Sequence, residues 1–367
     1  MRIALATDAW EPQTNGVVTT LRATRAELAA LGHDVRLIHG QQLRSIAAPS
    51  YPEIRLALNP GPYVARELKA FRPHAVHIAT EGPIGLAVRR YCRARGVPFT
   101  TSYHTRYPEY LAMRWPIPPA LTYAWLRRFH NAAARTFVSS PTLEQQLRVH
   151  GLGRLHLWRR GVDLGCFFPR PRAHPLLVER PRPLMVCVGR LAVEKNLTAF
   201  LELPLPGTKV LIGDGPQRAA LAARYPHALF AGYRFGTELA ELLACADVLV
   251  FPSRTDTFGL TMIEALACGV PVAAYPVAGP LDVLEAGVSG VMDEDLAAAV
   301  RGALQLERAV CAKRAGAFSW RVATQQFLAG LAPLPTALRA TLAVRRSSAM
   351  IVRRLAHRPT SQAGDAL

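Results

Sequence analysis

Short apolar runs alternate with helical segments along most of this 367-residue chain. Such alternation is typical of open α/β folds, in which a parallel sheet is covered by helices. The apolar runs predict strands at residues 2–8, 34–39, 75–80, 99–103 and 136–139, and again at 184–188, 209–212, 228–230, 248–251 and 272–275. Between the two sets, residues 169–183 contain five prolines, which is typical of a connector. The pattern therefore predicts two doubly wound α/β domains, with ligands bound at the strand ends that face the cleft between them.

The composition agrees with a large folded protein. Half of the residues are hydrophobic, and 367 residues are long for a single domain. The six cysteines are scattered without C-x-x-C spacing, which favours reduced, buried thiols over disulfides or a metal site. Asp8 and Glu11 follow the first apolar residues at once, so we expect no signal peptide, and no run approaches the ~20 apolar residues that span a bilayer. We expect a cytoplasmic protein.

A net charge of +18 indicates an anionic partner, either nucleic acid or a negatively charged membrane surface. No helix-turn-helix, RRM, KH or zinc-finger pattern is present. The absence of these patterns favours the membrane, and we expect no nucleic acid to bind.

Residues 253–269 (SRTDTFGLTMIEALACG) carry the most informative polar pattern. Asp256 and Glu264 are separated by seven residues, and Gly259 lies where a loop turns into a helix predicted at 261–267. Free N–H groups at such a helix start favour an anion, and the two carboxylates accept hydrogen bonds from hydroxyls. A nucleotide sugar carries both groups. On spacing alone, an ordinary strand-to-helix turn with solvated acids explains the segment about equally well.

This segment resembles the E-x7-E signature of retaining GT-B glycosyltransferases of family 4, with Asp256 in place of the first Glu. Five further blocks resemble the family in the expected order: residues 7–18 (TDAWEPQTNGVV), 103–110 (YHTRYPEY), 160–163 (RGVD), 188–196 (VGRLAVEKN) and 213–216 (GDGP). Together they extend over roughly residues 1–330. One block is a weak signal, but six in register are strong. The shorter acid at 256 puts the sugar contact made there in question.

The resemblance implies roles for the residues that bind the donor. Arg190 and Lys195 would neutralise the leaving diphosphate without a metal or another cofactor, which agrees with the absence of Asp-x-Asp. Glu264 would hold the ribose hydroxyls, and Asp256 a 3- or 4-hydroxyl of the sugar. The remaining expected donor-site residues are Gly16, Gly213, Gly215, Phe258, Gly259 and Leu260. For Gly16 and for the turn of Gly213 and Gly215, a plain turn remains an equal or nearly equal alternative.

His104 follows a predicted strand at the cleft end, and the resemblance implies that it faces the transferred sugar. We count it with Arg190, Lys195 and Asp256 as a candidate catalytic residue, although a lone histidine is more often structural. No residue stands out as a nucleophile. The family resemblance implies transfer with retention, in which the leaving phosphate helps to deprotonate the acceptor.

Aromatic and basic residues at Trp115, Trp125, Arg127 and Arg128 suit a membrane interface. A core helix with a solvated basic edge explains them equally well. The basic tail, residues 336–367, reads as an amphipathic surface helix or as a disordered segment. Family members with this kind of His-Thr-x-x-Pro block include enzymes that glycosylate diacylglycerol or related lipids.

We therefore expect an α/β, GT-B enzyme of two doubly wound Rossmann-like domains facing a central cleft, at residues 1–168 and 184–321, with residues 322–335 crossing back to the first domain. It would move glucose, glucuronic acid, galactose or mannose from a nucleotide sugar, expected to be UDP-linked, to a lipid such as diacylglycerol at the inner face of the plasma membrane. The alternatives are a soluble or polysaccharide acceptor, or a non-catalytic protein that binds nucleotide sugars or nucleic acid.

Overall fold

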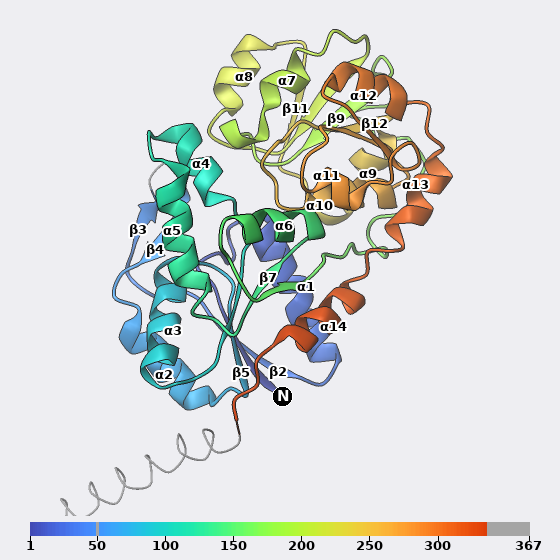
Figure 1. The fold of residues 1–367 in the computed structure, drawn as a ribbon. Coiled ribbons are helices and arrows are strands. Elements are labelled where there is room, and N and C mark those ends of the chain that lie inside the picture. Colours follow the sequence, from blue (N-terminus) through green and yellow to red (C-terminus); the bar gives the residue numbers. More distant parts are fainter. Residues whose placement is uncertain (49–50, 336–367) are drawn as a thin grey trace, which may run out of the picture.

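A computed structural model describes residues 1–48 and 51–335, and its main feature is two six-stranded parallel sheets (Figure 1). The first sheet has the order β2-β1-β5-β6-β7-β8. Its strands are β1 (Arg2–Ala6), β2 (Asp34–Ile38), β5 (Ala75–Ile78), β6 (Thr100–Ser102), β7 (Arg135–Val138) and β8 (Leu155–Leu157). The second has the order β11-β10-β9-β12-β13-β14. Its strands are β9 (Leu184–Val188), β10 (Thr208–Ile212), β11 (Leu229–Gly232), β12 (Val248–Phe251), β13 (Val272–Ala274) and β14 (Gly290–Met292).

Helices cover both faces of each sheet. Those of the first half are α1 (Gly16–Ala30), α2 (Gly61–Phe71), α3 (Pro83–Ala94), α4 (Tyr107–Arg114), α5 (Pro119–His130) and α6 (Pro141–Val149). Those of the second half are α7 (Leu197–Leu201), α8 (Arg218–Arg224), α9 (Gly236–Cys245), α10 (Leu260–Ala267), α11 (Pro280–Val283), α12 (Leu296–Ala303) and α13 (Arg308–Ala315), after which α14 (Trp320–Gly330) returns to the first half. In the part of the chain that the structure describes, no helix is both long enough and apolar enough to cross a membrane.

Local sequence explains many helix starts. Asn15 accepts hydrogen bonds from Val17 N and Val18 N at the start of α1, and Ser140 accepts one from Leu143 N at the start of α6. Proline stands in the first turn of α3, α5 and α6, where its missing N–H costs nothing. These signals fix where each of these helices begins.

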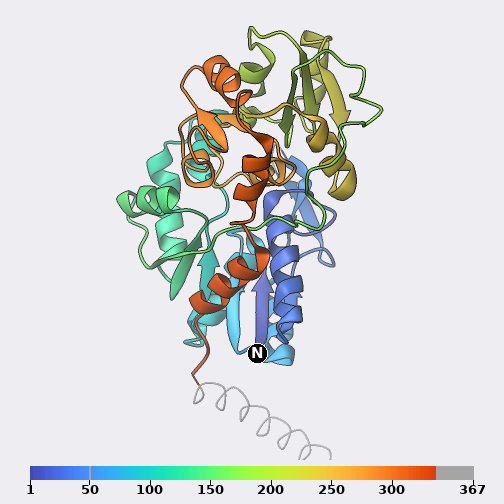
Figure 2. The same cartoon turned by 90° about the vertical axis from the view of Figure 1, so that its right-hand side faces the viewer.

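The two segments that join the domains cross directly against each other. Val162 N donates to Phe318 O at 3.1 Å, and a Cβ atom on Gly161 would lie 2.3 Å from Trp320 N. Only glycine allows the two backbones to approach so closely. Beyond the crossing, α14 packs along α1 (Figure 2). The buried Phe327 of α14 is in the same core cluster as Trp158.

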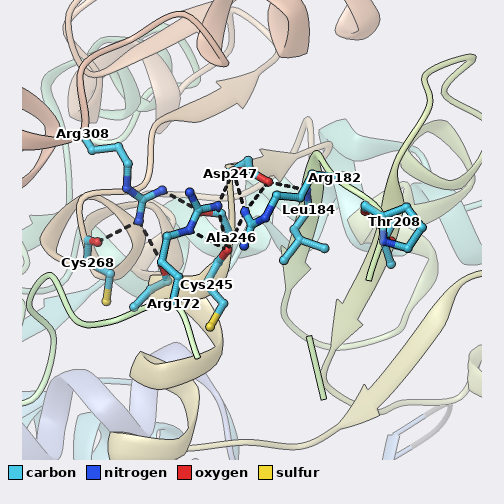
Figure 3. A network of polar contacts seen from close by, with 11 residues as sticks. Arg172, Arg182, Leu184, Thr208, Cys245, Ala246, Asp247, Cys268 and Arg308 are labelled. Atoms are coloured by element: carbon cyan, nitrogen blue, oxygen red, sulfur yellow. Dashed lines mark hydrogen bonds and ion pairs between the residues drawn. The ribbon is translucent and has the colours of Figure 1, made fainter. Parts of the chain in front are cut away.

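The connector between the sheets is fixed to the second domain by arginines (Figure 3). Arg172 and Arg182 both donate to the Asp247 carboxylate, which also accepts a bond from Leu184 N at 2.6 Å. Arg308 donates to Ala246 O at 2.6 Å and to Ala244 O at 2.9 Å. These guanidinium groups surround the last carbonyls of α9, where the helix dipole favours positive charge.

Most of the strands and helices expected from the sequence are present in the structure, and a few elements were not expected. The predicted strands all form, with ends that shift by at most two residues, and α14 begins at Trp320, two residues earlier than expected. The hairpin of β3 (Ser45–Ala48) and β4 (Tyr51–Ala57) and the short strand β14 were not predicted. These strands are too short, or too mixed in polarity, for alternation to reveal them. The basic tail at 336–367 lies outside the described residues.

Replacing Arg308 by alanine should lower the stability of the protein. The change removes charge-assisted bonds to buried carbonyls at the end of α9, at a cost of about 2 kcal/mol, which corresponds to a fall of a few degrees in the melting temperature. Arg301→Ala is the control, because Arg301 and its partner Asp295 are both more than half exposed and such pairs add little. Thermal unfolding followed by circular dichroism measures the difference, and equal melting temperatures for the two variants would contradict this role.

Candidate active site

A cleft of about 600 Å³ lies between the carboxyl ends of the two sheets. Its wall contains the loops that follow β1, β6, β9, β11 and β12, as expected for doubly wound sheets. The structure brings together most of the residues predicted for the site: Gly16, His104, Arg190, Lys195, Gly213, Asp256, Phe258, Gly259, Leu260 and Glu264. Gly215 is outside this lining.

Gly213 and Gly215 allow two loops of the second domain to touch. A Cβ atom on Gly213 would lie 1.9 Å from Gly189 O, and one on Gly215 would lie 2.6 Å from Leu191 O. Leu191 N also donates to Asp214 O at 2.9 Å. The turn after β10 therefore rests directly on the turn that carries Arg190, and this packing accounts for both glycines.

Lys195 and Asp256 form an ion pair inside the cleft. Lys195 Nζ lies 2.6 Å from Asp256 Oδ1 and 2.8 Å from Oδ2, although 60 residues intervene. Both side chains are mostly buried, with exposed fractions of 24% and 15%. Sequence reasoning assigned the two residues to different parts of the donor, whereas in the structure each orients the other. The lysine is thereby held as a fixed positive charge at the cleft wall.

The loop after Asp256 contacts the first domain. Thr257 Oγ1 donates to His104 O at 3.0 Å, and Ser139 Oγ donates to Thr257 O at 2.8 Å. Two residues later, Gly259 has φ = 88° and starts α10, with the side chains of Phe251 and Met262 where a Cβ atom would stand. Only glycine fits this left-handed, crowded position. The N-terminus of α10 is thus aimed at the cleft, where its dipole favours an anion.

Glu264 lies on the second turn of α10 and lines the cleft. Burial raises the pKa of its carboxyl group to about 7. The cause is desolvation, which disfavours the charged form. A partner that donates hydrogen bonds to the carboxylate, such as a pair of hydroxyls, would stabilise that charged form.

His104 is held by a residue that sequence reasoning did not assign to the site. Arg160 Nη2 lies 3.2 Å from His104 Nδ1, and both residues line the cleft. The only signal in the sequence was that Arg160 opens the block at 160–163. Burial, and after it the positive charge of Arg160, hold the pKa of His104 well below its ordinary value. This lowered pKa favours the neutral imidazole.

Asn15 and Gly16 form the first-domain side of the cleft. Asn15 Oδ1 accepts from Val17 N at 3.0 Å and from Val18 N at 3.1 Å, so these two amides already have a partner. A Cβ atom on Gly16 would lie 3.5 Å from Leu260 Cδ1 on the opposite wall. Gly16 therefore faces the start of α10 at close range.

Tyr233, Arg234 and Phe235 also line the cleft and were not predicted. The rings of Tyr233 and Phe235 stack with centroids 5.7 Å apart, and both are about half exposed. Their position directly after the predicted strand at 228–230 was the signal that could have revealed them.

The residues predicted for a membrane surface are separate from the cleft lining. Trp125 and Arg128 are exposed on α5, as is Leu121 one turn earlier, and Met113 and Ile117 are exposed in the segment before α5. Trp115 is half-buried. Arg127 is half-buried too, and it donates to His150 O at 3.1 Å near the end of α6.

Among residues 1–48 and 51–335, no three His, Cys, Asp or Glu side chains come together in a way that could hold a metal ion.

Comparison with known proteins places both halves of the chain. Residues 14–165 match the sequence model described as Glycosyltransferase Family 4, and residues 182–307 match that described as Glycosyl transferases group 1. A GDP-mannose-dependent alpha-mannosyltransferase of Mycobacterium tuberculosis is 32% identical over 316 residues, which cover 80% of this chain and 83% of the relative. An alpha-monoglucosyldiacylglycerol synthase of Streptococcus pneumoniae is 26% identical over 316 residues, which cover 75% and 71%.

Solved structures share the fold. A sucrose-phosphate synthase from Thermosynechococcus elongatus matches with a TM-score of 0.70 at 21% identity, over 89% of this chain and 97% of the other. The Anabaena protein HepE, solved with UDP and glucose, matches with a TM-score of 0.67 at 16% identity, over 89% and 98%. The predicted fold is confirmed: two Rossmann-like sheets in the GT-B arrangement. The chain belongs to glycosyltransferase family 4.

Proposed function

We propose that this glycosyltransferase moves a hexose from a nucleoside-diphosphate sugar to a hydroxyl group of a lipid acceptor, with retention of the anomeric configuration. The observation that carries the proposal is the cleft wall at residues 190–195 and 256–264. It combines two cations and a helix N-terminus with two carboxylates. Cations and the helix start suit a diphosphate, and the carboxylates suit hydroxyls.

These charged groups suggest how the nucleotide sugar binds. Arg190 and Lys195 would stabilise the negative charge that develops on the departing diphosphate, so we propose that transfer needs no metal ion. Asp256 would accept from a sugar hydroxyl and Glu264 from the ribose hydroxyls. The mannosyltransferase relative is named for GDP-mannose, whereas uracil was expected as the base. Both donors therefore have to be tested.

The lipid acceptor is supported by relatives and by one surface. The synthase from Streptococcus pneumoniae is named for a glycosylated diacylglycerol. In this chain, Met113, Ile117, Leu121 and Trp125 expose apolar side chains on α4, on α5 and on the loop between them, and α5 also exposes Arg128. Such a mixture suits the headgroup region of an anionic membrane, and we propose peripheral binding at the inner face of the plasma membrane.

The purified protein tests the proposal directly. It is incubated with UDP-glucose, UDP-galactose, UDP-glucuronic acid or GDP-mannose and with vesicles that contain diacylglycerol, in the presence of EDTA. We expect one donor to give an α-linked glycolipid. Transfer only to soluble sugars would refute the lipid acceptor, and activity that EDTA abolishes and Mg²⁺ or Mn²⁺ restores would refute metal independence.

Replacing Lys195 or Arg190 by alanine should lower kcat by about 10²–10³-fold, because each removes a charge that stabilises the leaving group in the transition state. Initial rates over a range of donor concentrations separate kcat from KM. Arg218→Ala is the matched control, because Arg218 pairs with Asp214 on the exposed side of the turn after β10. Turnover within about threefold of the wild type for either cleft variant would refute the assigned role.

Donor affinity should rise with pH up to about neutrality. With its pKa raised to about 7, free Glu264 holds a proton below that pH. Ribose hydroxyls that donate to the carboxylate favour its charged form, so the bound state holds fewer protons and binding strengthens as the pH rises through 7. Calorimetry with the intact nucleotide sugar should show up to about a tenfold gain per pH unit below 7, then a plateau. Glu264→Gln should bind weakly and without this slope, and a flat profile in the wild type would contradict the role.

The exposed apolar surface predicts binding to vesicles that contain phosphatidylglycerol. Each arginine near anionic lipid contributes about 1 kcal/mol, and salt weakens this attraction. In sedimentation assays, Leu121→Asp with Trp125→Ala should reduce the bound fraction severalfold. Val178→Asp is the control, since Val178 is exposed on the connector of the second domain. Equal binding of the double variant and the control would exclude this surface.

A further inference from the structure

The two ring nitrogens of His104 have different surroundings. Nδ1 lies 3.2 Å from Arg160 Nη2. A guanidinium group has only donors, so Nδ1 must accept this hydrogen bond through its lone pair. A neutral imidazole that accepts at Nδ1 carries its single proton on Nε2. The contact therefore selects one of the two neutral tautomers.

Arg160 is fixed by contacts other than the one to His104. Its side chain is buried, with 4% of its surface exposed, and Nη1 donates to Trp158 O at 2.6 Å. The guanidinium group lies over the Trp158 ring at 4.4 Å from the centroid. Trp158 is itself fully buried in the core that α14 completes. The donor to Nδ1 is thus held in place by the core of the first domain.

The same arrangement disfavours the doubly protonated ring. An imidazolium would place an N–H group and a second positive charge against the buried Arg160. His104 O accepts from Thr257, so the backbone is held from the opposite side of the cleft.

His104 Nε2 is shielded from solvent and has no hydrogen-bond partner among the described residues. His104 is part of the cleft wall that also contains Lys195 and Asp256. A buried N–H group without an acceptor is costly, and an oxygen atom of a substrate would remove that cost.

We propose that Arg160 is a positioning residue, which keeps His104 neutral with its proton on Nε2 so that this N–H donates to an oxygen atom of the transferred hexose. The inference rests on the proposed function for the identity of the ligand. It assigns His104 as a hydrogen-bond donor and excludes it as the base that deprotonates the acceptor.

Nuclear magnetic resonance of protein labelled with ¹⁵N in histidine tests the tautomer without any substrate. The spectrum of His104→Gln identifies the His104 signals by their loss. In the wild type we expect a bonded proton on Nε2 and none on Nδ1. In Arg160→Met this preference should be lost, and Arg160→Lys, which keeps one cationic donor, should restore it in part. A proton on Nδ1 in the wild type, in either the neutral or the charged ring, would overturn the proposal even if no variant folds.

Kinetics with the donor that supports transfer, UDP-glucose or GDP-mannose, test the consequence. Arg160→Met should lower kcat by about tenfold or more with a smaller change in KM, because the donor to the sugar is no longer oriented. His104→Gln keeps an N–H group near the place of Nε2 and should retain more activity than His104→Asn. Arg159→Met, at an exposed neighbouring position, is the control. A folded Arg160→Met variant with the wild-type tautomer and kcat would refute the positioning role, whereas an inactive wild type with the expected tautomer would count against the proposed function alone.

Discussion

The backbone crossing at Gly161 and Trp320 is the constraint on which the arrangement of the two domains depends. Side chains are excluded there, since a Cβ atom on Gly161 would lie 2.3 Å from Trp320 N. With both connecting segments pressed together, the carboxyl ends of the two sheets face each other, and the loops that follow the strands meet in one cleft. Arg160 and Trp158 immediately precede the crossing, so the residue that orients His104 belongs to the same packed unit as α14. The packing of the first-domain core around Trp158 therefore also fixes the position of His104 in the cleft.

Several polar contacts join the two domains at the cleft. Thr257 bonds to His104 O, Thr142 bonds to Asp282, and Arg114 on α4 forms a 2.6 Å ion pair with the buried Glu194. Glu194 directly precedes Lys195, which in turn pairs with Asp256. The bond of Thr257 joins two neutral groups and contributes about 1 kcal/mol, whereas the other two contacts involve charged groups and contribute more. The position of the donor-binding charges thus depends on both domains.

The sequence allowed the fold and much of the cleft lining to be predicted, because most of the expected residues lie in segments that follow predicted strands, and parallel strands end on the same side of a sheet. It could not reveal which of these residues pair. Lys195 reaches Asp256 across 60 intervening residues, and Arg160 reaches His104 across 55, so no local spacing encodes either contact. The sequence also did not reveal that the Asn15 side chain accepts hydrogen bonds from two backbone N–H groups at the start of α1, so these groups already have a partner. Gly213 and Gly215, expected at the donor, are explained by the packing of one turn on another.

The excess of arginine has a structural explanation as well as the electrostatic one drawn from composition. Arg89 donates to carbonyls at the end of α5, Arg135 to those at the end of α14, and Arg308 to those at the end of α9. A guanidinium group satisfies several terminal carbonyls at once and opposes the negative end of the helix dipole. Arginines used in this way do not reach a membrane as free charges, and Arg127, bound to His150 O, is in the same position. The net charge of +18 therefore overstates the charge available to a partner, and the case for a membrane depends on which arginines are exposed beside apolar side chains, as Arg128 is beside Trp125.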